Sequence, residues 1–396
     1  MKKGVAITGM GIISSIGNNV KENYRSLTNS SAGISFPQIL KTHHANLPVG
    51  EIKITNKTLA EILELPLNHS YTRAALLGVL AATEAIKESG LKEEHLSNTG
   101  FISGTSVGGM DLTEKHFREF KDSDENRRFI RAQHPGFTTG KITEYLGVGG
   151  FTSTISTACS SSATAIMLGA RMIKAGKLKR VIVGGTDCLT KFTLNGFNSL
   201  MILSPDNCKP FDNSRSGLNL GEGAAYLVLE AEDVLDGKKV LGRITGYGNA
   251  NDAFHQTASS QEGVGAFLAI QKAMDIAGLF PGDIDHINAH GTATLNNDLS
   301  ESRAILRVFG EKVPPLTSTK AFTGHTLAAA GAIEAVYSLL AIQNDEMFPT
   351  LNFQEAMEET GIIPVLQPEK KELRNVLSNS FGFGGNCTSL IFSKDE

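Results

Sequence analysis

The sequence of 396 residues has no tryptophan, only four cysteines and no long run of basic residues. Cys159, Cys188, Cys208 and Cys387 lie far apart and form no C-x-x-C spacing, which excludes a disulfide framework and a zinc knuckle and predicts reduced thiols. The 37 basic and 41 acidic residues leave a net charge of −4, so nucleic acid and anionic membranes are not expected partners.

The sequence also lacks an apolar stretch long enough to span a bilayer. The N-terminal segment "MKKGVAITGMGIISSIG" imitates a signal peptide, but glycines interrupt its apolar part and no suitable cleavage site follows. We therefore expect a cytoplasmic protein in which this segment forms a first strand and turn.

What the sequence has instead is glycine, at 41 residues, and an alternation of β-branched runs with segments of helical spacing. This alternation is typical of an α/β fold in which helices cover a sheet. No internal repeat is evident. The polar segment 232–240 predicts a linker between an N-terminal half, residues 1–232, and a C-terminal half, residues 240–396. The expected strands are 4–10, 99–106, 180–187, 224–231, 285–292 and 375–385, and helices are expected over 74–90 and 327–340.

The segment "STISTACSSSATAI" places Cys159 just before a predicted helix, because apolar residues recur at helical spacing from Ala163 onward. The hydroxyls of residues 160–162 are expected to cap this helix. Its free N–H groups and dipole are expected to lower the pKa of the thiol and to stabilise an oxyanion at an attacked carbonyl. The setting therefore predicts a nucleophile, whereas a buried structural role is the alternative for any free cysteine.

Two histidines have surroundings that favour a role beside such a nucleophile. His290 ends an apolar strand in "INAHGTATLNND", and His325 follows Lys320 by five residues in "TSTKAFTGHTLAAAG". Glu334 is a lone charge on the apolar helix that follows. It therefore lies either on an exposed face or beside a buried cation such as Lys320.

Metal and nucleotide sites are not favoured by the motifs. His286 and His290 lie four residues apart, but no acidic or cysteine ligands cluster around them. Neither "TGMGIISSIG" nor "SNSFGFGGNC" completes a phosphate-binding motif. The glycines that flank Phe383 predict a flexible turn that can bring backbone N–H groups close to a ligand.

Taken together, these motifs resemble the β-ketoacyl-acyl carrier protein synthases, in particular the elongating type II enzymes. The match runs nearly end to end, through "VAITGMGIISSIG", "STACSSS", "KPFDNSRSGLNLGEGAAYLVLE", "NAHGTAT", "STKAFTGHTLAAAGAIEA" and "SNSFGFGG". The resemblance implies a thiolase-like α/β fold of two related halves in five α-β-α-β-α layers, assembled as a homodimer. It also implies decarboxylative Claisen condensation of a Cys-bound acyl chain with malonyl-acyl carrier protein in fatty acid biosynthesis, with acyl-acyl carrier protein as donor and without a metal or redox cofactor.

The resemblance also implies the roles of individual residues. Cys159 would accept the acyl chain as a thioester, and His290 and His325 would hydrogen-bond the malonyl thioester carbonyl. Lys320 and Glu334 would form a supporting ion pair, and the charge of Lys320 would keep a neighbouring histidine neutral. Phe383 would contribute its backbone N–H to the oxyanion hole and would form the gate. The expected substrate contacts are Val107, Phe381, Thr292 and Thr294.

Two segments depart from the family pattern. Residues 293–298 and 252–263 lack prolines that are common in relatives, and both lie where relatives form the rim of the pantetheine tunnel. Contacts with the carrier and acyl specificity are therefore expected to differ. Arg127, Arg128 and Arg131 form the densest basic cluster and are the candidate docking site for an acidic carrier, with a solvated surface patch as the alternative.

Other functions remain as alternatives. A specialised condensing ketosynthase of a polyene or polyketide pathway would carry the same motifs. A non-catalytic chain-length partner typically lacks the cysteine that stands here at position 159. A degradative thiolase places its nucleophile near the N-terminus, which does not fit this sequence.

Overall fold

The computed structural model describes residues 4–120 and 124–395. Each half contributes five strands to one mixed sheet. The strands of the N-terminal half are β1 (Val5–Ser14), β4 (Gly100–Gly104), β5 (Thr152–Ile155), β6 (Arg180–Asp187) and β7 (Gly223–Glu230). Those of the C-terminal half are β8 (Gly242–Asn251), β9 (His286–Asn288), β10 (Leu316–Thr317), β13 (Asn375–Phe381) and β14 (Asn386–Ser393).

The two halves order their strands identically. The full order is β10-β9-β13-β14-β8-β1-β7-β6-β4-β5, so each half places its first strand innermost, followed by its fifth, fourth, second and third. The halves join where β1, paired along its length with β7, also pairs with β8 over residues 5–7. A chain without an evident sequence repeat therefore folds into two topologically related halves.

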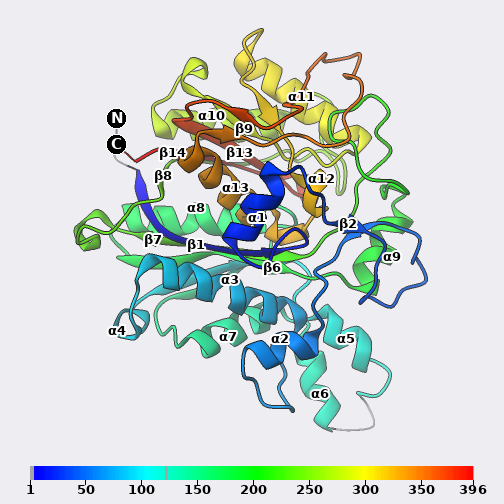
Figure 1. The fold of residues 1–396 in the computed structure, drawn as a ribbon, viewed down its shortest axis with the longest axis vertical. Helices are drawn as coiled ribbons and strands as arrows, with labels where there is room; N and C mark the ends of the chain where they lie inside the picture. The colour runs from blue at the N-terminus through cyan, green and yellow to red at the C-terminus, as the bar shows by residue number, and fades with distance from the viewer. Residues whose placement is uncertain (1–3, 121–123, 396) are drawn as a thin grey trace.

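Helices separate and cover the two halves of the sheet, giving five layers (Figure 1). α8 (Ser161–Lys174) and α13 (Ala330–Asn344) lie in the middle layer, and α3 (Arg73–Ser89) with α7 (Pro135–Leu146) covers the outer face of the N-terminal strands. α10 (Val264–Ala277) with α11 (Leu295–Phe309) covers the C-terminal strands. The expected thiolase-like α-β-α-β-α architecture is confirmed. The remaining helices are α1 (Val20–Thr28), α2 (Asn56–Ile62), α4 (Glu93–Leu96), α5 (Met110–His116), α6 (Asp124–Arg131), α9 (Lys191–Ser199) and α12 (Lys320–Thr323).

The middle helices pack closely because their contact residues are small. A Cβ atom at Gly331 of α13 would lie 2.8 Å from the Cβ of Ala163 and 2.9 Å from its amide nitrogen in α8. α13 is also buried on every side, which explains why its sequence is apolar all round rather than along one stripe. The stretch Leu327–Asn344 has the length and the mean hydropathy, 1.2, of a membrane span, but 89% of it is buried inside the molecule.

Glycines near the N-terminus serve packing and do not end the strand. The expected strand 4–10 is in fact β1, which continues to Ser14. A Cβ at Gly9 would lie 2.2 Å from the carbonyl oxygen of Ala85, and a Cβ at Gly11 would lie 2.1 Å from that of Ala81. Both glycines therefore let α3 approach β1.

The expected helix 74–90 is confirmed as α3, whereas the expected strand 285–292 is shortened to β9.

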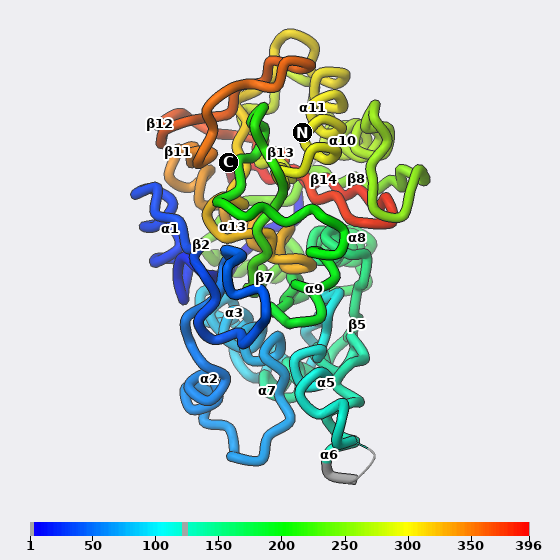
Figure 2. The backbone as a smooth tube through the Cα atoms, turned by 90° about the vertical axis from the view of Figure 1, so that its right-hand side faces the viewer, coloured from blue at the N-terminus to red at the C-terminus, as the bar shows by residue number. Residues whose placement is uncertain are grey.

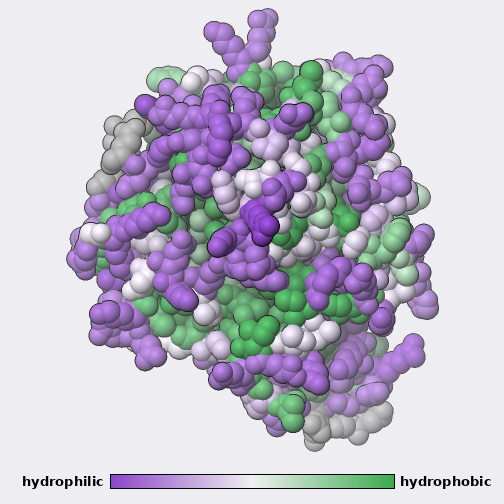
Figure 3. Space-filling model, in the orientation of Figure 1, coloured by the Kyte–Doolittle hydropathy of each residue, from purple (hydrophilic) through white to green (hydrophobic). Residues whose placement is uncertain are grey.

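The molecule is elongated, with α10 and α11 at one end and α6 at the other in both views (Figures 1 and 2). The face seen in Figure 3 is covered mainly by hydrophilic side chains, with smaller apolar patches between them. The segment 232–240, expected as a linker, contains the short helix η1 (Glu232–Val234) and joins β7 to β8.

Candidate active site

A cavity of about 290 Å³, here called the active-site cavity, lies where the two halves meet. Its lining combines Cys159, which precedes α8, with His290, which follows β9, and His325, which follows α12. The expected substrate contacts Thr292, Thr294 and Phe381 also line it, as does the expected gate Phe383. The segments that carry Cys159 and Phe383 are also joined directly, because Ser160 Oγ donates to Asn386 Oδ1 at 2.8 Å.

Tight backbone contacts place these residues around the cavity. Ala158 adopts the left-handed conformation with φ of 51°, which turns the chain sharply between β5 and α8. The N–H of His325 donates to the carbonyl oxygen of Asn219 at 2.7 Å, and its carbonyl accepts from Gly221 N–H at 2.9 Å. The motif "GLNLGEG" thus holds the loop that carries His325.

The three serines after Cys159 connect segments but do not cap α8. Ser160 Oγ donates to the carbonyl of Thr157 at 2.7 Å, and Ser161 Oγ donates to that of Ala158 at 2.5 Å. Ser162 Oγ accepts from the N–H of Ala332 in α13 at 2.9 Å. The capping prediction was wrong, because these hydroxyls hydrogen-bond to the turn and to the neighbouring helix.

Cys159 is buried, and burial dominates its ionisation. Desolvation raises the pKa of the thiol to about 12, whereas the charge of Lys320 and hydrogen bonds from the backbone N–H groups of Phe383 and Cys159 lower it. The expectation of a lowered pKa was wrong. Cys159 is only 6% exposed, so desolvation raises the pKa of its thiol by more than Lys320 and the N–H donors lower it. The two N–H groups that face Sγ are nevertheless the donors that an oxyanion would use.

Lys320 links Glu334 to His290. Its ammonium donates to Glu334 Oε1, donates to the carbonyl oxygen of His290 at 2.5 Å and lies 3.2 Å from His290 Nδ1. Since an ammonium only donates, Nδ1 of His290 is the acceptor and Nε2 carries the proton. Glu334 is 2% exposed, so it is the buried partner of a cation and not part of an exposed face. Burial raises its pKa to about 7 against the opposing effect of Lys320.

Both active-site histidines are neutral. Burial lowers the pKa of His290 and that of His325 well below the usual range, and the charge of Lys320 lowers both further, as expected. Their ring centroids lie 5.3 Å apart with the planes at 84°. Two neutral imidazoles therefore lie side by side in the cavity.

Glu301 of α11 is a residue that sequence reasoning missed. Its carboxylate accepts from the N–H groups of His290 and Gly291 at 2.9 and 2.8 Å and from Asn379 Nδ2 at 3.1 Å. Burial raises its pKa to about 7. The available signal was a pair of acids three residues apart, Asp298 and Glu301, on the helix directly after "NAHGTAT".

Phe383 lies over the cavity on a loop that only glycine allows. A Cβ at Gly382 would lie 2.7 Å from the carbonyl oxygen of Thr157 and 3.1 Å from the nitrogen of Cys159. The Phe383 ring stacks on Phe197 of α9, with centroids 5.6 Å apart and planes at 17°. The aromatic pair covers the side of the cavity next to Cys159.

Val107 is not among the residues that line the active-site cavity. It packs against a cluster of buried aliphatic side chains that includes Leu218, and Leu218 lines the cavity. The place of Val107 in an acyl pocket stays a prediction.

The three arginines lie on α6, at the end of the molecule opposite α11 (Figures 1 and 2). Arg127 and Arg131 are exposed. Arg128 is half-buried, since its guanidinium lies 4.6 Å from the centroid of the Phe129 ring and donates to the carbonyl oxygen of Asn68 at 3.3 Å. Docking at α6 stays a prediction.

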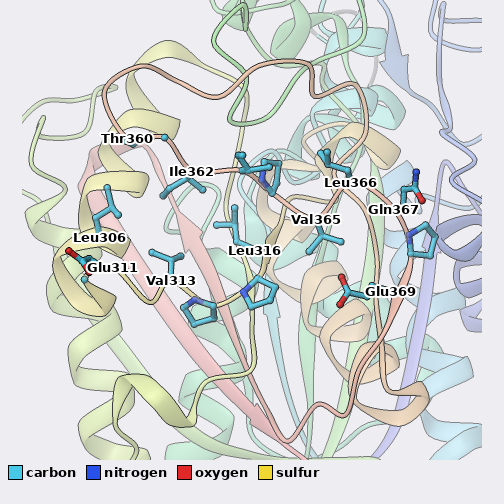
Figure 4. A pocket seen from close by; sticks show the side chains of 17 residues that line it. Leu306, Glu311, Val313, Leu316, Thr360, Ile362, Val365, Leu366, Gln367 and Glu369 are labelled. Carbon is cyan, nitrogen blue, oxygen red and sulfur yellow. The ribbon is translucent and has the colours of Figure 1, made fainter.

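Two other candidate sites, the ring of His286 and a second hollow, offer no catalytic group of this kind. His286 Nδ1 lies 2.9 Å from the carbonyl of Pro315 and Nε2 lies 3.1 Å from Thr317 Oγ1, so both ring nitrogens have protein partners. A hollow of about 900 Å³ lies between α11, β10 and residues 360–369 (Figure 4). Its lining contains aliphatic side chains, prolines, Glu311 and Glu369 but no cysteine or histidine, so it offers no nucleophile of the kind found at Cys159.

Family models and relatives agree with this geometry. The model described as β-ketoacyl synthase, N-terminal domain, matches residues 2–234, and that of the C-terminal domain matches residues 241–354. A 3-oxoacyl-[acyl-carrier-protein] synthase 2 of Staphylococcus aureus (strain COL) is 33% identical, over 100% of this chain and 99% of the relative. A protein of the same name from Vibrio cholerae is 30% identical, over 99% of both chains.

Solved structures show the same likeness. The ishigamide ketosynthase/chain length factor superposes with a TM-score of 0.93 at 29% identity, covering 100% of both chains. The ketosynthase ApeO in complex with its chain length factor ApeC, from Xenorhabdus doucetiae, superposes with a TM-score of 0.84 at 32% identity, covering 99% of this chain and 98% of that one. The chain therefore belongs to the β-ketoacyl synthase family of condensing acyltransferases.

Proposed function

We propose that this protein is a β-ketoacyl-[acyl-carrier-protein] synthase that elongates acyl chains in fatty acid biosynthesis. The observation that carries the proposal is the convergence of Cys159, two neutral histidines and two backbone N–H donors on one cavity. Acyl-acyl carrier protein and malonyl-acyl carrier protein are the substrates. This assignment follows the two relatives named 3-oxoacyl-[acyl-carrier-protein] synthase 2, which align over nearly their whole length.

In the first half-reaction Cys159 takes the acyl chain. The sulfur attacks the thioester carbonyl of acyl-carrier, the bond to the carrier sulfur breaks, and the thiol proton of Cys159 ends on the released carrier thiol. The N–H groups of Cys159 and Phe383 stabilise the oxyanion of the tetrahedral intermediate, where charge develops only during reaction. The product is an acyl thioester on Cys159.

In the second half-reaction malonyl-carrier loses CO₂, and the bonding electrons pass to an enolate. His290, with its proton on Nε2, and His325 donate to the enolate oxygen as its charge develops. The enolate carbon then attacks the acyl carbonyl, the bond to Cys159 Sγ breaks as the β-ketoacyl-carrier forms, and the released thiolate takes a proton from water. Covalent catalysis thus divides one difficult condensation into two easier steps.

A second candidate is condensation in a polyene or polyketide pathway. It is favoured by the likeness to the ishigamide ketosynthase/chain length factor and to ApeO, which was solved with a chain length factor. The two candidates share the chemistry of the active-site cavity and differ in acyl substrate and in the partner subunit.

For assembly we propose a homodimer formed through β5. This strand lies at one edge of the sheet and pairs only with β4 within the described residues. Phe151 beside it is 45% exposed. An open edge strand is a ready surface for pairing with another chain. A heterodimer with a chain-length partner is the corresponding assembly for the second candidate. A cytoplasmic location remains a prediction.

The test is to incubate the purified protein with a panel of acyl-carriers and malonyl-carrier and to weigh the products. Release of carriers two carbons longer, with a 3-oxo group, is the expected result for saturated acyl chains. Cys159→Ala should abolish condensation but retain slow decarboxylation, because the histidine donors remain. Elongation of only unsaturated or polyketide chains would favour the second candidate. Acyl transfer to Cys188, Cys208 or Cys387 would contradict the site assignment.

A further inference from the structure

Asp187, the last residue of β6, is fully buried and lies outside the lining of the active-site cavity. Its carboxylate accepts hydrogen bonds from two separate segments. The hydroxyls of Thr105 and Ser106 donate to it, both at 2.6 Å. The backbone N–H groups of Ser106 and Val107 also donate, at 3.2 and 3.1 Å. From the opposite side it accepts the N–H of Ala328 at 3.0 Å.

These segments come from different halves of the molecule. Residues 105–107 follow β4 and include Val107, which packs against the same cluster as Leu218 of the cavity lining. Ala328 belongs to the short helix η3 (Leu327–Ala329), which follows His325 closely. One carboxylate thus ties a loop of the N-terminal half to a turn of the C-terminal half.

These hydrogen bonds require both oxygens of Asp187 to act as acceptors. Oδ1 accepts from Val107 N–H and Oδ2 accepts from Ala328 N–H, and a backbone N–H can only donate. An amide at this position would turn its NH₂ group toward one of these donors. The site is therefore built for a carboxylate.

The charge of an ionised Asp187 also bears on Cys159, and burial raises the pKa of Asp187 itself. Its negative charge raises the pKa of the thiol, whereas the charge of Lys320 lowers it. The other titratable groups at the cavity, His290 and His325, are held neutral. Burial raises the pKa of Cys188 and that of Tyr226 above their usual values, and the charge of Asp187 raises both further.

We infer that Asp187 is a positioning residue of the condensing site: its carboxylate holds residues 105–107 to the turn after His325. This inference rests on the proposed function. Asp187 lies outside the lining of the active-site cavity and acts through the loop and the turn.

The decisive measurement is the rate at which iodoacetamide alkylates Cys159 between pH 6 and 9, followed by peptide mass mapping. Asp187→Asn should raise this rate about three- to tenfold at each pH, because loss of the negative charge stabilises the thiolate. Asp187→Glu retains the charge and should stay within about twofold of the unaltered protein. Cys159→Ala supplies the blank. An unchanged rate in a folded Asp187→Asn protein would show that the Asp187 carboxyl carries no charge near Cys159 and would contradict its role as a carboxylate tether.

The positioning part is tested by acyl-carriers of different length. Asp187→Glu pushes the carboxylate outward by about one bond length, about 1.5 Å, and Ser106→Ala removes one donor. Both should raise KM for the longest acyl-carriers accepted more than for short ones, and Ser106→Ala should leave alkylation unchanged. If Asp187→Asn does not fold, these two variants carry the test, and unaltered acyl preference in both would overturn the inference. Alkylation needs no condensation, so an effect of Asp187→Asn in a protein without synthase activity would refute the proposed function and leave the carboxylate role of Asp187 standing.

Discussion

At the scale of single residues, the chemistry depends on how far burial changes each ionisable group. The Cys159 thiol, with its pKa raised to about 12, is protonated before substrate binds. Desolvation outweighs Lys320 and the two backbone N–H donors. The donors therefore contribute mainly when an oxyanion forms beside the sulfur, which is where stabilisation increases the rate.

The two histidines offer a test of the division into half-reactions. His290→Ala and His325→Ala should each slow decarboxylation of malonyl-carrier by about a hundredfold or more, the usual effect of removing one oxyanion donor. Transfer of acyl groups to Cys159 in a single turnover should fall much less. His95→Ala, on α4, is the matched control. Equal losses in both half-reactions would show that a histidine activates the thiol instead.

Glu301 makes stability depend on pH in a predictable direction. Its pKa is about 7 in the folded protein, against an ordinary value of 4.5, so the folded state binds its proton more tightly. The resulting stabilisation is fully present below pH 4.5 and is lost as the pH rises through 7. Between pH 5 and 8 this loss amounts to about 2 kcal/mol.

Glu301→Gln should therefore reduce the fall in the free energy of unfolding between pH 5 and 8, as measured with urea. The variant should be less stable at both pH values, because a Gln amide would face the N–H of His290 or Gly291. An unchanged pH dependence would show that Glu301 ionises in the folded protein as readily as in water.

At the scale of elements, the loop between β4 and α5 sets the wall behind the cavity. Val107 packs on the same leucine cluster as Leu218, which lines the cavity. Val107→Phe should push Leu218 inward and shorten the acyl chains accepted by a few carbons, while the shortest primers remain usable. The product lengths from an acyl-carrier panel measure this, and an unchanged preference would remove Val107 from the acyl pocket.

The helix α6 carries the candidate docking site, and the structure changes the best variant for testing it. Arg128 packs on Phe129, so reversing its charge would disturb the helix, whereas Arg127 and Arg131 are exposed. Arg127→Glu with Arg131→Glu should raise KM for carrier-bound substrate about three- to tenfold at low salt and less at high salt.

Turnover of a small acyl thioester without carrier should hardly change in the same variant. Lys57→Glu, on α2, is a control for the general change in charge. Similar losses with both substrates would mean that the arginines support the fold, and the docking assignment would be abandoned.

At the scale of the whole molecule, β5 leaves one edge of the sheet open. Light scattering should find a dimer of this chain alone, and Phe151→Lys with Thr152→Lys should convert it to monomers, because charged side chains block edge-to-edge pairing. Leu67→Lys, at a fully exposed position elsewhere, is the control. A monomer at high concentration would reject the homodimer, and a complex formed only with a chain-length partner would support the second candidate.

The sequence by itself determined the residues whose chemistry is local: Cys159 before a small-residue helix, His290 and His325 in their motifs, and the family to which they belong. The family resemblance also predicted that Lys320 keeps a neighbouring histidine neutral, and the charge of Lys320 lowers the pKa of both His290 and His325. Only the tertiary structure decided the pKa of the thiol and the positions of Glu301 and Asp187. Desolvation depends on how completely the two halves enclose a group, and the donors that satisfy Asp187 lie 80 to 141 residues away in the chain. No local pattern records either quantity, since both arise only when the two halves pack together.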